Sequence, residues 1–186
     1  MKRLLAILFL SLSLYSCNDG EIIVNTFNFD DVPLKTCGDV GNYVFYKENT
    51  RVYESLSLRL GTMDSIYNTQ GTKIYELSDN TNFVNYRSYD GPLGNNYFCS
   101  SIPPTAPTVE VNYLAVSGRA EVIVTFEIEP APKTYTGSNL GNRASIKKSV
   151  QVILKDLVLV SGDNQIIQET LNMGTIENVR VEEINP

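Results

Sequence analysis

Apolar and polar side chains alternate over much of this chain, and the alternation predicts β-strands. The clearest example in the first half covers residues 52–60, where apolar side chains take one face and polar ones the other: Val52, Leu56, Leu58 and Leu60 against Ser55, Ser57 and Arg59. A period of two over this length is typical of a half-buried strand. Glu54 shares the parity of the apolar face, so we expect it at the edge of that strand.

The second half of the chain contains longer alternating segments. Residues 109–116 and 119–128 flank Ser117-Gly118, and a two-residue connection of this kind favours a β-hairpin. Residues 149–160 are largely apolar on both faces, which is typical of a central strand. Shorter strands are expected at residues 22–29, 43–47, 73–77, 83–89, 165–173 and 179–181.

Turn residues separate these segments, and no stretch has a convincing helical period. About ten short strands with this spacing predict an all-β fold, an antiparallel β-sandwich of the immunoglobulin-like or jelly-roll-like kind. The proline-rich stretch 101–107 is either a linker between two domains or a crossing between sheets of one domain. Two halves of about 80 residues would each have a small core, so we predict a single domain over residues 22–186.

The N-terminus has the pattern of a secretory signal. Lys2 and Arg3 precede an apolar run that is far shorter than the ~20 residues needed to span a bilayer. The run ends at Leu14-Tyr15-Ser16-Cys17, which resembles the bacterial lipobox, in which the cysteine becomes the first mature residue and carries the lipids. The alternative is an ordinary signal peptide whose removal leaves a soluble protein. We favour a lipoprotein whose signal peptide is residues 1–16 and whose lipidated residue is Cys17.

The residues after Cys17 indicate where such a lipoprotein resides. Residues 17–21 form the lipidated tether, and Asn18-Asp19-Gly20-Glu21 partly resemble the acidic surface-export tether of lipoproteins from the Bacteroidota. Any tether is polar, so two locations stay open. We expect lipid anchoring in the outer membrane, on the periplasmic face or at the cell surface.

Cys37 and Cys99 remain once Cys17 is assigned to the lipid. They are either a disulfide or two buried free thiols, and an oxidising compartment favours the disulfide. A bond that closes a loop of this length would contribute about 4 kcal/mol to stability.

Composition excludes several kinds of chemistry. The net charge of −6, without a basic run, argues against nucleic acid as a partner. The chain has no histidine, which removes Ser/His and Cys/His nucleophile systems and the commonest metal ligand. Two separated cysteines cannot form a zinc site, and no glycine-rich phosphate loop is present. We therefore predict no catalytic residues, no metal and no cofactor.

Three weaker patterns leave alternatives. Carboxylates such as Asp30, Asp31, Glu127 and Glu129 could act in pairs in a glycosidase, but solvated strand faces and turns are the commoner reason for such residues. Eleven tyrosines without tryptophan could mark a binding face, although tyrosine is equally common on ordinary strands. Asp64-Ser65-Ile66 resembles the O-glycosylation signal of the Bacteroidota, which makes Ser65 a weak candidate for modification.

Three features together resemble the small outer-membrane and surface lipoproteins of the Bacteroidota, of the flavobacterial type. They are the lipobox, the segment Phe27-Asn28-Phe29-Asp30-Asp31 followed by Cys37, and the hairpin expected after the proline-rich stretch. The resemblance implies a β-rich outer-membrane lipoprotein and carries no activity.

We predict a non-catalytic binding or interaction module whose partner is an unidentified protein or glycan, and which contacts the membrane through its N-terminal lipid. One alternative is a structural envelope component that acts through a bacterial partner protein. A further alternative is a histidine-free glycoside hydrolase that uses two carboxylates.

Overall fold

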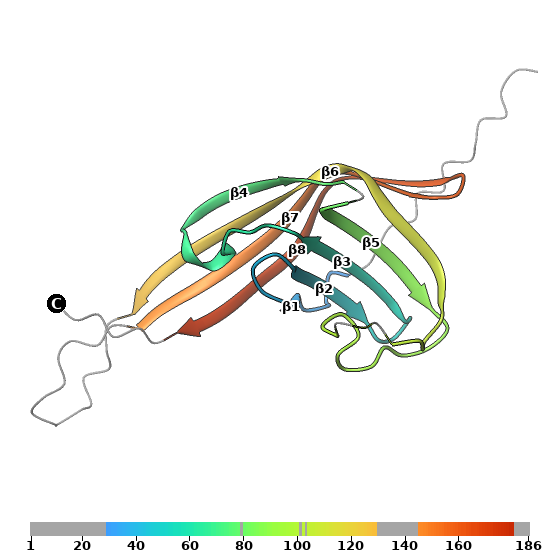
Figure 1. Cartoon of the computed structure of the whole chain (residues 1–186), viewed down its shortest axis with the longest axis horizontal. Coiled ribbons are helices and arrows are strands. Elements are labelled where there is room, and N and C mark those ends of the chain that lie inside the picture. Colours follow the sequence, from blue (N-terminus) through green and yellow to red (C-terminus); the bar gives the residue numbers. More distant parts are fainter. Residues whose placement is uncertain (1–28, 79, 101, 103, 130–144, 181–186) are drawn as a thin grey trace, which may run out of the picture.

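The computed structural model describes residues 29–78, 80–100, 102, 104–129 and 145–180. This part of the chain contains eight strands and one 3-10 helix (Figure 1). In chain order they are β1 (Lys35–Cys37), β2 (Tyr43–Asn49), β3 (Glu54–Leu60), η1 (Ile66–Asn68), β4 (Gly71–Glu76), β5 (Asn82–Tyr89), β6 (Val109–Glu129), β7 (Ser145–Ser161) and β8 (Asn164–Arg180).

The strands form one antiparallel sheet in the order β1-β2-β3-β5-β6-β7-β8, and β4 pairs with β6 beside this path. The sheet curls strongly into a half-barrel (Figure 1). The predicted all-β antiparallel class is therefore confirmed. The arrangement is not clearly the predicted two-sheet sandwich, because hydrogen-bonded pairing runs without a break from β1 to β8.

Strand β6 corrects the predicted hairpin at Ser117-Gly118. It is a single strand of 21 residues that runs through this dipeptide. Its first part pairs with β5, its later part pairs with β4, and β7 lies along its other edge. The register with β7 shifts on both sides of Ser117, which marks a β-bulge, and β6 bends sharply near its middle (Figure 1). The dipeptide therefore bends a strand and does not end one.

Gly118 is the residue that makes this bend sterically feasible. Its φ of 129° lies in the region that favours glycine. A Cβ placed there would lie 3.0 Å from the Leu157 Cα and 3.1 Å from the Lys155 carbonyl oxygen, both backbone atoms of β7. The neighbouring Asp156 also has a positive φ, of 52°, and its carboxylate lies 2.8 Å from the Arg119 guanidinium.

We expect Gly118→Ala to lower the free energy of unfolding by about 1–3 kcal/mol, because the new methyl group meets backbone that cannot rotate away. Chemical denaturation followed by circular dichroism measures the change. Gly162→Ala is an informative comparison: its φ of 58° is also positive, but no atom lies within 4 Å of the position that its new Cβ would take. An equal loss in both variants would show that conformation, and not the crowding by β7, determines the cost.

The other two long strands also join or extend predicted segments. β7 lies between β6 and β8, as expected for a central strand. β8 is one strand of 17 residues where residues 165–173 and 179–181 were expected to be separate. Merging in β6 and β8 replaces four predicted segments by two strands, whereas β1 was not predicted. The strand expected at residues 22–29 lies, apart from Phe29, outside the described residues.

The hydrophobic core lies against the concave face of the curled sheet. Leu56, Leu58 and Leu60 have no exposed surface, which confirms the apolar face predicted for β3; on its polar face Arg59 is exposed, but Ser55 is buried. Val52 departs from that prediction, because it lies in the β2–β3 turn and is 53% exposed. Strands β6 and β7 extend the same core with Val122, Val124, Val150, Val152 and Leu154.

The region around the proline-rich stretch is fixed by pairing and by a disulfide. Strands β5 and β6, which precede and follow residues 101–107, pair with each other in the same sheet. Cys37 and Cys99 form the predicted disulfide, with their Cα atoms 5.7 Å apart. The bond joins the end of β1 to the segment that follows β5.

Candidate functional site

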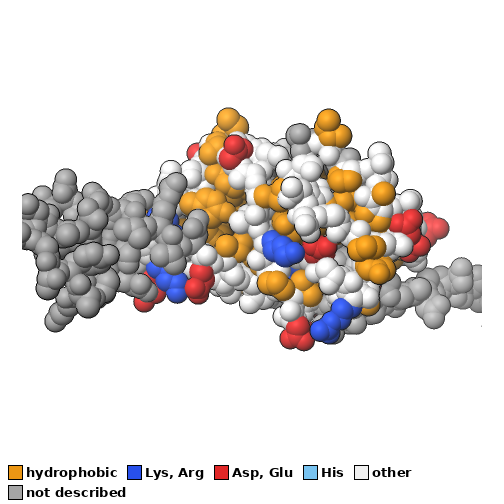
Figure 2. Space-filling model, turned by 90° about the horizontal axis from the view of Figure 1, so that it is seen from below, with side chains coloured by type: hydrophobic (Ala, Val, Ile, Leu, Met, Phe, Trp, Pro, Cys, Tyr) orange, Lys and Arg blue, Asp and Glu red, His pale blue; other side chains and the backbone are white. Residues whose placement is uncertain are grey.

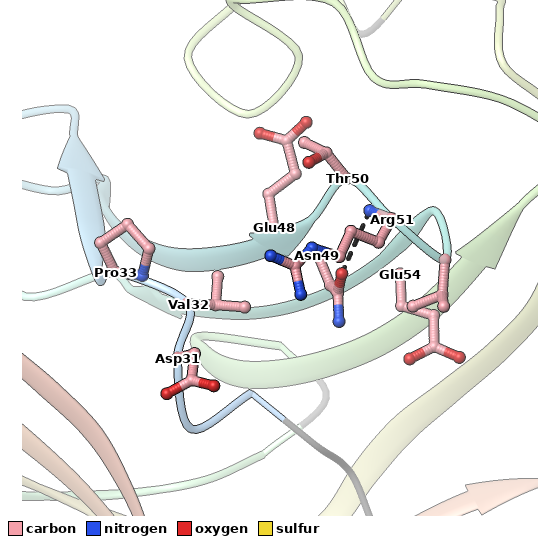
Figure 3. A pocket seen from close by; sticks show the side chains of 9 residues that line it. Asp31, Val32, Pro33, Glu48, Asn49, Thr50, Arg51 and Glu54 are labelled. Atoms are coloured by element: carbon pink, nitrogen blue, oxygen red, sulfur yellow. Dashed lines mark hydrogen bonds between the residues drawn. The ribbon is translucent and has the colours of Figure 1, made fainter.

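A groove of about 510 Å³ lies between the β2–β3 turn and the segment before β1 (Figure 3). Polar and charged side chains dominate its lining, with three apolar residues among them. The lining residues are Asp31, Val32, Pro33, Glu48, Asn49, Thr50, Arg51, Val52 and Glu54. The groove thus combines the end of one hairpin with a segment that lies before β1 in the sequence.

The conformation of the β2–β3 turn shapes one wall. The Arg51 amide donates to the Asn49 Oδ1 at 3.2 Å (Figure 3). Tyr53 has a φ of 54°, which is rare for an aromatic residue, and its carbonyl accepts a hydrogen bond from the Tyr89 amide at 3.0 Å. The turn is therefore held against the end of β5, and it leaves Val52 and Tyr53 exposed beside the groove.

Two of the groove carboxylates have partners that fix their positions. Glu48 forms a salt bridge with Lys35 at 3.3 Å. Glu54 interacts with the Tyr86 side chain, which packs against the core cluster. Burial, with a smaller contribution from Glu54, raises the pKa of Tyr86 well above its usual value, so its hydroxyl stays protonated beside the carboxylate.

Arg51 supplies the positive charge in the groove. Figure 3 shows its side chain extending from the turn across the groove toward Val32. Within the described residues, Arg51 makes no salt bridge shorter than 4 Å. Its guanidinium therefore shares the groove with three acidic residues and forms no ion pair with any of them.

A buried lysine, Lys47, lies on β2 directly before Glu48, which lines the groove. Lys47 is 5% exposed, although Asn49, two residues on, lines the groove. Desolvation lowers the pKa of Lys47, and the nearby Asp30 carboxylate acts in the opposite direction. Asp30 therefore compensates a charge in the interior, while Asp31 faces the groove.

The groove can hold a polar or charged ligand by hydrogen bonds and charge. Carboxylates, an amide, a hydroxyl and a guanidinium line it, and these groups support binding more directly than nucleophilic catalysis. In the part of the chain that the structure describes, no group of three or more Asp, Glu, Cys or His side chains could hold a metal ion.

The structure separates the carboxylates named from the sequence. Asp31 lines the groove, whereas Glu127 lies on β6 opposite Lys147 of β7. Glu48, Arg51 and Glu54 of the groove were not identified from the sequence. The departure of Glu54 from the alternation of β3 was the one signal that could have indicated this region.

The remaining sequence predictions have mixed outcomes. Ser65 is half-buried and directly precedes η1. Cys17 and the rest of the predicted tether lie outside the described residues. Most of the tyrosines proposed as a binding face are structural: Tyr67, Tyr75 and Tyr86 pack against the core, and Tyr89 is buried, with its hydroxyl 3.0 Å from the Ser55 Oγ.

No protein-family model, curated protein sequence or solved structure matches this chain. Within the described residues, no helix has the length and apolar character needed to cross a membrane.

Proposed function

We propose that this protein is a lipid-anchored component of the outer membrane that works as a non-catalytic binding module. The observation that carries the binding role is the polar groove between the β2–β3 turn and residues 31–33. Binding sites commonly lie in loops that a rigid scaffold positions, and here the curled sheet is that scaffold. The unidentified partner is a protein or a glycan on the periplasmic face or at the cell surface.

The character of the surface also supports a localised site. On the face shown in Figure 2, hydrophobic side chains lie in small groups between charged and neutral ones. A mixed surface of this kind is ordinary for a folded protein and does not indicate a large apolar interface. The groove, with its exposed Val52 and Tyr53, is the more specific feature.

A binding screen tests this function. Purified protein would be assayed against glycans, soluble proteins and envelope proteins, in parallel with a Glu54→Gln variant that removes one negative charge from the groove lining. Binding that the variant weakens would support the groove as the site. Absence of binding to any glycan, soluble protein or envelope protein would contradict the binding role.

The lipid anchor is supported by the sequence around Cys17. The chain between Cys17 and Phe29, the first described residue, can span at most about 40 Å when extended, so the folded part would stay close to the membrane. Ser65 remains the proposed O-glycosylation site. A mass shift that Ser65→Ala removes would support that modification.

We expect Cys17→Ser to move most of the protein from the membrane fraction to the soluble fraction, because the acyl chains provide most of the membrane affinity. Fractionation of intact cells, with fatty-acid labelling of the chain, measures the change. Ser16→Ala keeps a small residue before the cysteine and is the matched control. If the wild-type and Cys17→Ser proteins were retained equally in the membrane fraction, and neither carried lipid, the proposed anchor would be wrong.

The structural alternative rests on a different observation. β8 is an edge strand of 17 residues, and within the described part it pairs only with β7. A long strand edge can pair with a strand of another protein. Crosslinking in intact cells would then give one fixed bacterial neighbour. The glycosidase alternative, which would use groove carboxylates, requires polysaccharide turnover that a single Asp or Glu substitution abolishes.

A further inference from the structure

We propose that the groove binds an extended cationic peptide segment bearing Lys or Arg side chains, and that Arg51 occupies the place of the ligand's cation when the groove is empty. This inference rests on the proposed binding function and names its ligand class. It follows from the charges of the groove, its apolar walls and the way Glu54 is held.

The charges around the groove are only partly compensated within the protein. Lys35 lies against Glu48, and Lys47 lies near Asp30 in the interior. Asp31 and Glu54 remain at the groove with Arg51 as the cation beside them. Neither carboxylate has a salt bridge within 4 Å in the described part of the chain, so a second cation would find two oxygen acceptor groups there.

The apolar lining fits the stem of a long cationic side chain. Val32 and Pro33 line the groove from the segment before β1, and Val52 lines it from the β2–β3 turn. Lys and Arg side chains commonly place their methylene groups along apolar surface and keep the charged end in a polar environment. A groove lined by both apolar residues and carboxylates matches that division.

Glu54 is positioned before any ligand arrives. Its carboxylate is close enough to the Tyr86 hydroxyl to help raise the pKa of that tyrosine, and Tyr86 packs against the core beside Phe29 and Tyr113. An acceptor that is already oriented loses little conformational freedom on binding. The same carboxylates disfavour anionic ligands such as phosphate groups.

Substitution of Arg51 tests whether its side chain occupies the ligand's place. Its guanidinium crosses the groove without an ion-pair partner in the described residues, so a ligand cation would displace it. Arg51→Ala should therefore strengthen binding about threefold, because an internal competitor and a like charge are both removed. Arg59→Ala removes the same charge from an exposed position on β3 outside the groove, and it should change affinity less than twofold.

The experiment uses the processed full chain in detergent and a fluorescein-labelled hexapeptide amide of alternating Arg and Ala, followed by fluorescence anisotropy. We expect saturable binding that weakens as salt is added. Glu54→Gln should weaken it about fivefold, and Asp31→Asn, at an exposed position, should weaken it in the same direction. Glu169→Gln, an exposed position on β8, carries the same charge change and should leave affinity within about twofold.

Equal effects of Glu54→Gln and Glu169→Gln, or of Arg51→Ala and Arg59→Ala, would overturn the inference, because attraction to overall negative charge would then explain the binding. Failure of the peptide to bind, together with a glycan or protein that binds in a Glu54-dependent way, would overturn the ligand class and leave the binding function standing. Failure of every probe would contradict both.

Discussion

Replacing Cys37 and Cys99 together by serine is expected to lower the free energy of unfolding by about 4 kcal/mol. The disulfide joins residues 62 positions apart, so it restricts a long loop of the unfolded chain. It also holds the segment after β5 against β2, where the Phe98 ring stacks on Tyr46 with centroids 4.5 Å apart. Urea denaturation of the oxidised wild type and the double variant measures the loss.

The reduced wild-type protein provides the control for this prediction. It lacks the bond but keeps both sulfur atoms, so its stability should fall close to that of the double variant. A stability unchanged by either treatment would show that the folded state does not depend on this bond. Loss in the variant alone would assign the effect to the substituted side chains.

Leu58→Ala is expected to cost about 3 kcal/mol of unfolding free energy. Leu58 is completely buried on β3, with Phe45 of β2 and Val84 of β5 as its cross-strand partners. Those neighbours belong to strands on both sides, and collapse around the smaller side chain would require both strands to move. Chemical denaturation measures the loss, and a decrease below about 1 kcal/mol would contradict tight packing at this position.

Arg59→Ala is the matched control, one residue further along the same strand. Arg59 is exposed, and its guanidinium lies 5.5 Å from the centre of the Phe83 ring. An exposed contact of this kind contributes about 0.5–1 kcal/mol. A similar loss in both variants would mean that Leu58 is packed no more tightly than the exposed Arg59.

The alternation of side chains predicted β3 well because one face of that strand is fully buried. Leu56 and Leu58 have no exposed surface, whereas Arg59 between the strand's inward residues is exposed. The disulfide was equally accessible to sequence reasoning, since three cysteines with one assigned to the lipid leave a single pair. Local pattern and residue chemistry were sufficient in both cases.

The course of β6 could not be predicted from the same kind of pattern. Ser117-Gly118 between two alternating segments is compatible with a tight turn and with a bulge. The difference depends on which strands are available as partners. Here β5 and β4 pair with successive parts of β6, and that pairing depends on residues far away in the sequence.

The groove was missed for a similar reason. Asp31 and Glu54 are separated by β1 and β2 in the sequence, and only the folded sheet brings both to one groove. From the sequence, Asp31 was one of several candidate carboxylates, Glu127 among them, that could not be paired. Residue type alone does not say which acidic groups become neighbours.

Because β6 pairs with β5 along one part and with β4 along another, it belongs to both halves of the molecule. Removing it would leave two otherwise separate groups of strands without a common neighbour. Neither half can therefore release β6 without weakening the other. We expect its middle amide hydrogens to exchange with solvent only when the whole protein opens, so that the two halves unfold as one cooperative unit.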